Sequence, residues 1–247
     1  MSAPLFTIIT PTFNAAATIG RTLASVDSQS FTDYEHLIVD GNSKDGTLAT
    51  SEKFSNDRRT IISEPDAGLY DAMNKGMART KGQYLIFLNA GDCFHSNDTL
   101  SIIAKAIKDN AMPGIVYGQT LLVDNDGNTV GPRHLTAPDQ LTLASFANGM
   151  LVCHQAFVAL RKICGGYDLR YRFSADYDWC IRCLQHSRLN VGLTDTVFIN
   201  YLNEGLTTKN HRKSLMERFK IMCYYYGTLP TIFRHIGFAL RWYRRGK

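Results

Sequence analysis

The sequence has no apolar run of about 18 residues, the length that a membrane-spanning helix needs. We therefore expect no transmembrane helix. The six cysteines, at positions 93, 153, 164, 180, 183 and 223, are scattered along the 247 residues, unlike the dense cysteines of small secreted domains. No signal peptide is visible, so a reducing cytoplasm is the expected compartment.

Paired metal ligands and glycine-rich phosphate loops are also missing. Cys180 and Cys183 have metal-pair spacing, but no second CxxC or CxxH pair accompanies them, which favours two small apolar side chains on one helix face over a zinc site. The turn after the first apolar run reads Thr-Pro-Thr-Phe-Asn, with no glycine until Gly20, and no P-loop follows. A dinucleotide-dependent dehydrogenase and a P-loop NTPase are therefore disfavoured.

Short apolar segments alternate with amphipathic ones along the first 110 residues. Strands are predicted at 5–10, 35–40, 60–65 and 83–92. Helical periodicity follows the first strand, at Ile19, Leu23 and Val26, and helices are also predicted within 66–82 and 98–110. Such alternation predicts an α/β fold with a mostly parallel, Rossmann-like sheet covered by helices on both faces.

A different pattern follows Gly114. A hairpin is predicted over 115–131, a helix over 174–187, one or two strands within 189–202 and a helix over 211–227, followed by a second short basic helix over 231–245. From 211 to 247, nine basic residues face one acid, Glu217. A basic tail is typical of a segment that binds an anionic surface such as membrane lipid. An equally favoured interpretation is that these basic residues only form the solvated face of a helix. No nucleic acid is expected as a partner.

Polar residues stand at the carboxyl ends of three predicted strands, where open parallel sheets bind ligands. They are Thr10 to Thr12, Asp40, and the segment from Asn89 to Asp92. Alone, Asp92 fits an Asx turn or a helix cap. Together with Asp40 and the acids of 66–71, it favours a phosphate-bearing ligand with a divalent cation, which binds one or two carboxylates and the phosphates.

Four segments in order carry a resemblance to a known family: TIITPTFNAAATIGRTLASVDSQSF, HLIVDGNSKDGT, EPDAGLYDAMNKGMARTKGQYLIFLNAGD and GGYDLRYRFSADYDWCIR. Over residues 5–205 the chain resembles family 2 glycosyltransferases of the GT-A fold, in particular the colanic-acid and surface-polysaccharide branch. The EPDAGLYDAMNKG block and Cys153-His154-Gln155 indicate that branch. The resemblance implies a nucleotide-diphosphate sugar donor, with a UDP-sugar favoured, together with Mg²⁺ or Mn²⁺ and inversion at the anomeric carbon.

The resemblance also implies donor-side roles for individual residues. The base and ribose pocket would be lined by Thr10, Pro11, Asn14 and Asp40. Many relatives have two acids where this chain has Asp40-Gly41. The sugar and phosphates would be flanked by Asp66, Asn74 and Lys75, although a lone lysine on a helix is often only solvated. Of the family's metal-binding DxD only Asp92 is kept as an acid, so Asp92 would bind the metal with Asn89 as a polar helper. One carboxylate holds a metal weakly, so the ion would bind only together with the nucleotide or be dispensable.

Inverting transfer needs a second carboxylate that takes the proton of the attacking hydroxyl. The resemblance implies that Asp176 is this base, because it stands where the family has it. The alternative is that Asp176 only stabilises the start of a helix, where the helix dipole favours an acid. Asp178 is the alternative base or an acceptor-side residue, and Arg182 one turn later is expected to pair with it. His154 and Gln155 would lie on the acceptor side, although a single histidine after an apolar stretch is often an interior residue.

The expected function is an inverting hexosyltransferase of bacterial surface-polysaccharide synthesis, acting on a saccharide or a lipid-diphosphate-linked acceptor. A glycosyltransferase domain would span 1–205, divided into a nucleotide-binding half (1–92) and an acceptor half (93–205). The basic, aromatic helical tail 206–247 would hold the enzyme at the inner face of the plasma membrane. The alternatives are a non-catalytic sugar-nucleotide-binding relative and, less favoured, a sugar nucleotidyltransferase.

Overall fold

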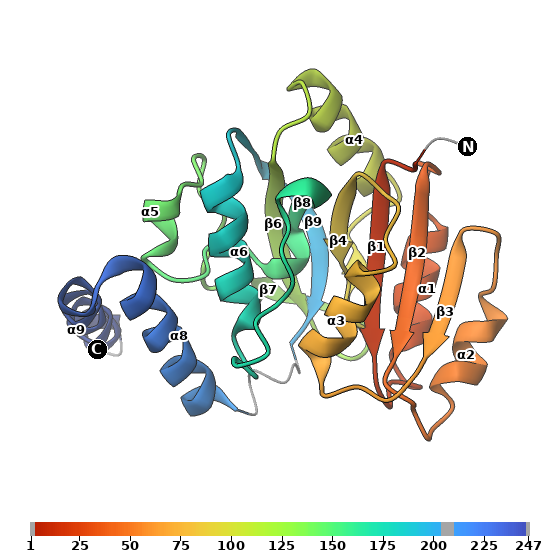
Figure 1. Ribbon diagram of the computed structural model, residues 1–247, viewed down its shortest axis with the longest axis horizontal. Coiled ribbons are helices and arrows are strands. Elements are labelled where there is room, and N and C mark those ends of the chain that lie inside the picture. Colours follow the sequence, from red (N-terminus) through yellow and green to blue (C-terminus); the bar gives the residue numbers. More distant parts are fainter. Residues whose placement is uncertain (1–2, 204–209, 246–247) are drawn as a thin grey trace.

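The computed structural model describes residues 3–203 and 210–245. Its strands form one sheet in the order β3-β2-β1-β4-β8-β6-β9-β5, with β7 paired to β6 (Figure 1). The strands are β1 (Phe6–Thr12), β2 (Tyr34–Asp40), β3 (Arg59–Ser63), β4 (Tyr84–Phe87), β5 (Cys93–Phe94), β6 (Ile115–Val123), β7 (Thr129–Pro132), β8 (Phe157–Leu160) and β9 (Asn190–Leu202).

Helices cover both faces of this sheet. They are α1 (Ile19–Asp27), α2 (Thr47–Lys53), α3 (Leu69–Met77), α4 (Thr99–Asp109), α5 (Leu143–Phe146), α6 (Ala175–His186), α8 (His211–Tyr226) and α9 (Thr228–Arg245), with short 3₁₀ turns η1 (His154–Ala156) and η2 (Arg161–Ile163). In Figure 1, α3 and α6 lie in front of the sheet, α1 lies behind it, and α8 and α9 form the end opposite β3.

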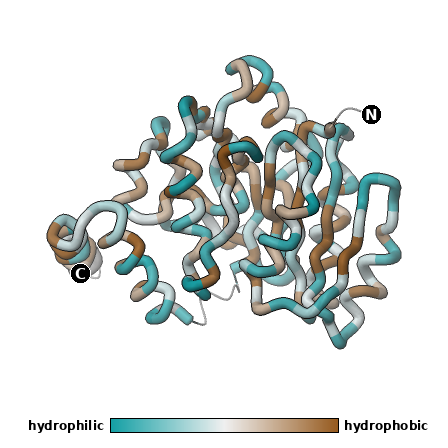
Figure 2. The backbone as a smooth tube through the Cα atoms, in the orientation of Figure 1, coloured by the Kyte–Doolittle hydropathy of each residue, from teal (hydrophilic) through white to brown (hydrophobic). Residues whose placement is uncertain are grey.

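The core follows from the two-residue alternation of the central strands. In β1, Ile9 packs with α3 and α6, whereas Phe6 and Ile8 pack with α1 and α4. In β4, Leu85 and Phe87 face the first group of helices, and Tyr84 and Ile86 face the second. Figure 2 shows the resulting hydrophobic strands inside more hydrophilic connections. Both faces are therefore buried, which explains the nearly continuous apolar runs in the sequence.

The predicted α/β fold is confirmed, with strands β3, β2, β1 and β4 all parallel. The second half of the sheet is mixed, because β8 is antiparallel to both β4 and β6, while β6 and β9 are parallel. The predicted hairpin is the antiparallel pair β6–β7. The last helix is longer than expected, since α9 begins immediately after Gly227.

The expected domain boundary at residue 205 lies outside the described residues. In the ranges 3–203 and 210–245, none of the helices is both long enough and apolar enough to cross a membrane.

Candidate functional site

The carboxyl ends of β1, β2 and β4 and the first turns of α3 and α6 meet along the lower edge of the molecule in Figure 1. The strands bring their ends together because they are parallel and in register, for example Thr12 beside Asp40. The helices begin there because each returns antiparallel to the strands. Most of the predicted site residues lie along this edge.

Asp40 organises the loop after β2. Its side chain is fully buried, and its carboxylate accepts hydrogen bonds from the Ser43 backbone N–H (3.0 Å) and the Ser63 hydroxyl (2.7 Å), as well as from the Ser43 hydroxyl. With these donors in place, Asp40 holds the ends of β2 and β3 together. A direct contact with ribose or base stays a prediction.

Because Gly41 has no side chain, the Asp66 carboxylate can lie beside it. A Cβ atom on Gly41 would collide with the Asp66 carboxylate and approach the Phe13 ring, at 3.2 Å from its Cδ2. Asp66 therefore occupies the space beside Asp40 where a second acid after β2 would stand. Phe13 is 61% exposed at the same place, a large apolar surface with no cover from the described residues. The sequence interpretation did not single out Phe13, although its position in Thr-Pro-Thr-Phe-Asn was available as a signal.

The other residues predicted for the nucleotide pocket divide into buried and exposed ones. Thr10 and Pro11 are buried within β1, and the Thr10 hydroxyl is 2.9 Å from Nε2 of His36, inside the sheet. Asn14 is exposed and takes a left-handed conformation (φ 47°), and its Oδ1 accepts the Lys44 backbone N–H (2.9 Å). Thr10 and Pro11 are therefore interior residues of β1 that support this edge of the sheet. Asn14 holds the loop that follows β1 in place.

Two buried polar atoms at this edge lack partners among the described residues. They are the hydroxyl oxygen of Thr12, at the end of β1, and Oδ1 of Asn89, just beyond β4. An unpaired buried polar atom costs about 1–3 kcal/mol. Both stand at carboxyl ends of neighbouring strands, which makes them candidates for hydrogen bonds to a ligand.

Asn74 and Lys75 both make contacts within the protein, and their contacts with sugar and phosphates stay predictions. Asn74 binds both backbone groups of Tyr167, with its Nδ2 donating to the carbonyl (3.0 Å) and its Oδ1 accepting the N–H (2.6 Å). The Lys75 ammonium donates to the Pro65 carbonyl (2.5 Å) and lies 3.5 and 3.4 Å from Glu64 and Asp71. Its charge is thus already balanced by two acids.

Asp92 lies in a tight turn after β4. Gly91 precedes it with φ 105°, a conformation that favours glycine, and a Cβ there would collide with Leu202. The two oxygens of Asp92 accept hydrogen bonds from the Gln155 side-chain amide and the Leu202 backbone N–H, both 2.9 Å long. Burial raises the pKa of this carboxyl to about 7, and the two hydrogen bonds and Arg21 oppose the rise.

Asp92 does not fit a preformed cation site in this arrangement. Its side chain is 3% exposed, and each oxygen already faces an N–H donor rather than open space. Among the described residues, no group of three or more histidine, cysteine or acidic side chains could hold a metal ion. The role of Asp92 as a metal ligand therefore stays a prediction, for an ion that would bind only together with the nucleotide diphosphate.

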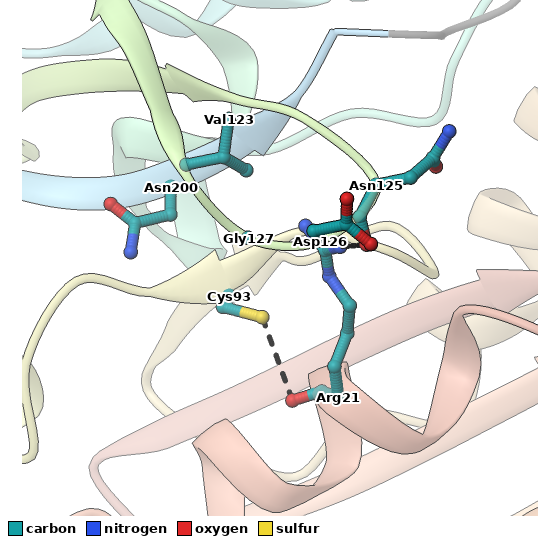
Figure 3. Close-up of a pocket in the computed structure, with 7 residues that line it drawn as sticks. All are labelled: Arg21, Cys93, Val123, Asn125, Asp126, Gly127 and Asn200. Atoms are coloured by element: carbon teal, nitrogen blue, oxygen red, sulfur yellow. Dashed lines mark hydrogen bonds between the residues drawn. The ribbon is translucent and has the colours of Figure 1, made fainter.

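A pocket of about 390 Å³ opens on the α1 side of the Asp92 turn (Figure 3). Its lining includes Arg21, Cys93, Asn200 and the hairpin turn between β6 and β7. Arg21 donates to the carbonyl of Gly91 (2.7 Å) and to that of Asn125 (2.9 Å), so the guanidinium joins the Asp92 turn to the hairpin. Asp176 does not line this pocket. The pocket therefore lies next to the candidate site and is not the candidate site itself.

Asp176 has the geometry of an oriented but available carboxylate. Its Oδ1 accepts hydrogen bonds from the Tyr70 hydroxyl (3.0 Å) and the Tyr177 backbone N–H (2.9 Å). Its Oδ2 has no hydrogen bond from the described residues, and the side chain is partly exposed. Burial and the neighbouring Asp176 charge raise the Tyr70 pKa well above its usual value, so Tyr70 stays protonated as a donor. Tyr70 was not predicted from the sequence, and its partner lies 106 positions away.

Asp178 points elsewhere and is 5% exposed. Its Oδ2 accepts Nε of Arg182 (2.8 Å), which confirms the predicted pair, and its Oδ1 accepts the Tyr225 hydroxyl (2.8 Å). Two residues along a helix turn the side chain by about 200°, so Asp178 packs against α8 while Asp176 faces the sheet edge. Asp178 thus helps to hold α6 to α8, and an acceptor-side role for it stays a prediction.

His154 and Gln155 are also interior residues, at 4% and 5% exposure. The His154 ring stacks on Phe87 with 4.9 Å between ring centroids, and its Nε2 is 2.6 Å from the Tyr167 hydroxyl. Burial lowers the His154 pKa to about 4, so the ring is neutral at pH 7. Gln155 reaches Asp92 rather than the side of Asp176. Ring packing and the Asp92 turn thus hold the two side chains inside the protein, and acceptor-side roles for them stay predictions.

Two curated relatives are similar over different shares of the chain. A PGL/p-HBAD biosynthesis glycosyltransferase of Mycobacterium bovis is 34% identical over 226 residues, covering 88% of this chain and 85% of that protein. The Escherichia coli UDP-Glc:alpha-D-GlcNAc-diphosphoundecaprenol beta-1,3-glucosyltransferase WfgD is 29% identical over 136 residues, 53% of each chain.

Solved structures of low sequence identity share the fold. The S. aureus TarS fragment 1–349 in complex with UDP-GlcNAc has a TM-score of 0.74 and 18% identity, covering 90% of this chain and 65% of that chain. Glucosyl-3-phosphoglycerate synthase from Mycobacterium tuberculosis, solved with Mn²⁺, UDP-glucose and phosphoglyceric acid, has a TM-score of 0.62 and 14% identity, covering 89% and 80%. The family model for glycosyl transferase family 2 matches residues 7–164. Together with the 34% identical relative, this match shows that the chain belongs to glycosyl transferase family 2.

Proposed function

We propose that this chain is an inverting glycosyltransferase that moves a sugar from a UDP-sugar to an acceptor hydroxyl, with Asp176 as the general base. One observation carries the proposal: the Asp176 carboxylate is oriented through Oδ1 by Tyr70 and keeps Oδ2 available at the ligand-binding edge of the sheet. A general base needs this combination of fixed direction and free lone pairs.

The donor would bind where the loops after β1, β2 and β3 meet. The exposed Phe13 ring offers a stacking face for the base, and Asp66 beside Gly41 offers acceptors for ribose or base N–H and O–H groups. The unpaired Thr12 hydroxyl and Asn89 amide oxygen extend this polar lining toward β4. The names of two similar proteins, which mention UDP-Glc and UDP-GlcNAc, support a uridine donor.

The chemistry would be a direct displacement. The acceptor hydroxyl attacks the anomeric carbon, Asp176 Oδ2 takes the hydroxyl proton, and the bond to the diphosphate breaks on the opposite face, which inverts the anomeric configuration. A positioned base contributes about 10²–10⁴ in rate. Tyr70 keeps the carboxylate aimed by donating to the oxygen that does not react.

The acceptor class is proposed from a relative. WfgD is named for a sugar linked to diphosphoundecaprenol, which supports a lipid-diphosphate-linked saccharide and a role in surface-polysaccharide synthesis. The Mycobacterium bovis relative is also named for a biosynthetic glycosyltransferase.

The test measures sugar transfer from UDP-glucose and from UDP-GlcNAc to a GlcNAc-diphospho-lipid, with Asp176→Asn as the variant and Asp178→Asn as the matched control. We expect Asp176→Asn to lower kcat by about 10²–10⁴ while UDP still binds. NMR of the product should show the β-anomer. Unchanged turnover in Asp176→Asn would remove Asp176 from the mechanism, and binding of UDP without any transfer by the wild type would favour a non-catalytic relative.

A further inference from the structure

The last helix carries a row of exposed apolar side chains. Exposure is 69, 40, 71, 51 and 56% for Leu229, Ile232, Phe233, Ile236 and Leu240. Spacings of three, one, three and four residues place them along one face of α9. Figures 1 and 2 show α9, with its hydrophobic residues, at the end of the molecule opposite β3. One face of α9 therefore has no cover among the described residues.

The opposite face of α9 is occupied, so the helix is fixed in orientation. Thr231 is fully buried, Phe238 packs against the main core cluster, and the His235 ring lies edge-to-face with Phe219 of α8 at 5.1 Å. On α8, the hydroxyl of Tyr226 donates to the Leu143 carbonyl at 2.9 Å. Tyr225, Tyr226 and Phe238 thus serve internal packing, and Tyr224 and Phe233 remain exposed.

The charge of this end of the molecule favours one kind of partner. Residues 211–247 contain nine basic residues and one acid, Glu217. The Glu217 carboxylate accepts the backbone N–H groups of Arg172 and Phe173 (3.0 and 2.8 Å), so it faces the body of the protein. On α8, Arg212, Lys213 and Lys220 are exposed. A second copy docked on α9 would bring like charges together, whereas an anionic lipid surface would attract them.

We propose that the exposed face of α9 is a membrane-binding surface for anionic phospholipid. The helix would lie in the plane of the interface, with Leu229, Phe233, Ile236 and Leu240 inserted among the acyl chains and the exposed basic residues of α8 at the headgroups. An apolar face with aromatic and aliphatic residues and a positive surround is typical of such interfacial helices.

The attachment would set the position of the proposed base relative to the lipid. The Ser174 hydroxyl, two residues before Asp176, lies 2.9 Å from the Ser214 hydroxyl in the first turn of α8. The α8–α9 pair is thus joined to the start of α6 by direct contacts. The proposal does not rest on the proposed donor or acceptor, because lipid binding is measured without either.

The test is co-sedimentation of the full chain with phosphatidylcholine vesicles that contain or lack phosphatidylglycerol. We expect binding to the phosphatidylglycerol vesicles that weakens as salt is added. The double variant Phe233→Ser with Ile236→Ser should lower the partition coefficient about tenfold or more, because burying one such side chain is worth about a factor of ten. The matched control, Ile102→Ser, replaces an exposed apolar residue on helix α4 and should bind as the wild type does.

Three results would overturn the proposal. They are equal binding to both kinds of vesicle, unchanged binding by the double variant, and a concentration-dependent dimer in sedimentation velocity that the double variant abolishes, which would assign this face to a second copy. Circular dichroism and UDP-induced thermal stabilisation of the variant establish that it is folded. If UDP fails to bind the wild type while vesicles bind, the proposed function fails and the membrane proposal stands.

Discussion

The hydroxyl of Tyr70, at the start of α3, donates a 3.0 Å hydrogen bond to Asp176, at the start of α6. The two residues are 106 positions apart, and the contact joins the α3 helix, which packs on β1 and β2, to the proposed catalytic base on α6. The Tyr70 ring is itself stacked on Tyr167 with centroids 5.4 Å apart, which limits its freedom. The carboxylate is therefore aimed by a rigid aromatic neighbour rather than by its own helix alone.

Tyr70→Phe tests this positioning. We expect kcat to fall about tenfold, because one hydrogen bond to a charged group is lost. The KM for the donor should stay unchanged, because Tyr70 contacts the proposed general base, Asp176, and is not proposed to contact the nucleotide. Steady-state kinetics at varied donor concentration measure both constants. A rise in KM with unchanged kcat would instead assign Tyr70 to substrate binding.

Phe13→Ala should weaken nucleotide binding. Aromatic stacking on a base is worth about 1–3 kcal/mol, so we expect Kd for UDP to rise about tenfold or more in calorimetry. Val130→Ala is the matched control, since Val130 on β7 is similarly exposed, at 59%, and is not one of the residues proposed for the donor site. Equal affinities in the wild type and Phe13→Ala would remove Phe13 from the donor site.

Manganese alone should leave the melting temperature unchanged. A ligand raises stability only if it binds the folded state, and the Asp92 oxygens already accept N–H donors from Gln155 and Leu202. Differential scanning fluorimetry with Mn²⁺, with UDP and with both separates the contributions. A saturable rise in melting temperature with Mn²⁺ alone would show that a cation can replace the Gln155 amide at the Asp92 carboxylate.

Asn74→Ala should reduce stability more than Lys75→Met does. The asparagine change leaves both backbone groups of Tyr167 unpaired and should cost about 1–3 kcal/mol in the free energy of unfolding. The lysine change removes partly exposed ion pairs worth about 0–1 kcal/mol. Urea unfolding measures both values. Loss of UDP binding in Asn74→Ala at undiminished stability would restore its predicted ligand role.

The buried His154 should make the free energy of unfolding decrease in mild acid. Its folded-state pKa of about 4 is below the unfolded value of 6.5 because burial disfavours the charged ring. The unfolded state therefore binds the proton first, and stability present above pH 6.5 is lost as the pH falls toward 4, by up to about 1.4 kcal/mol per pH unit. Comparing wild type and His154→Gln isolates this histidine from His36. Parallel pH profiles would show that the pKa of His154 is the same in the folded and unfolded states.

Local patterns were enough to predict the framework. The alternation of apolar strands and amphipathic helices gave the α/β architecture, and the Asn-Asp-Gly turn indicated the β6–β7 hairpin, because periodicity and turn chemistry act within a few residues. The polar residues at the strand ends were also predicted to share one edge, since parallel strands place their carboxyl ends together. Asp92 and Asp176 were selected by the family pattern on that framework.

What the sequence determined by itself was which segments fold and which polar residues lie near the edge. Only the tertiary structure decided which of them remain available to a ligand. Asp176 and Asp178 look alike in the sequence, but Arg182 and Tyr225 occupy both oxygens of Asp178, and one oxygen of Asp176 stays unbonded among the described residues. The physical reason is that hydrogen-bond partners and burial come from segments far apart in the chain, as Gln155 does for Asp92, and no local pattern encodes them.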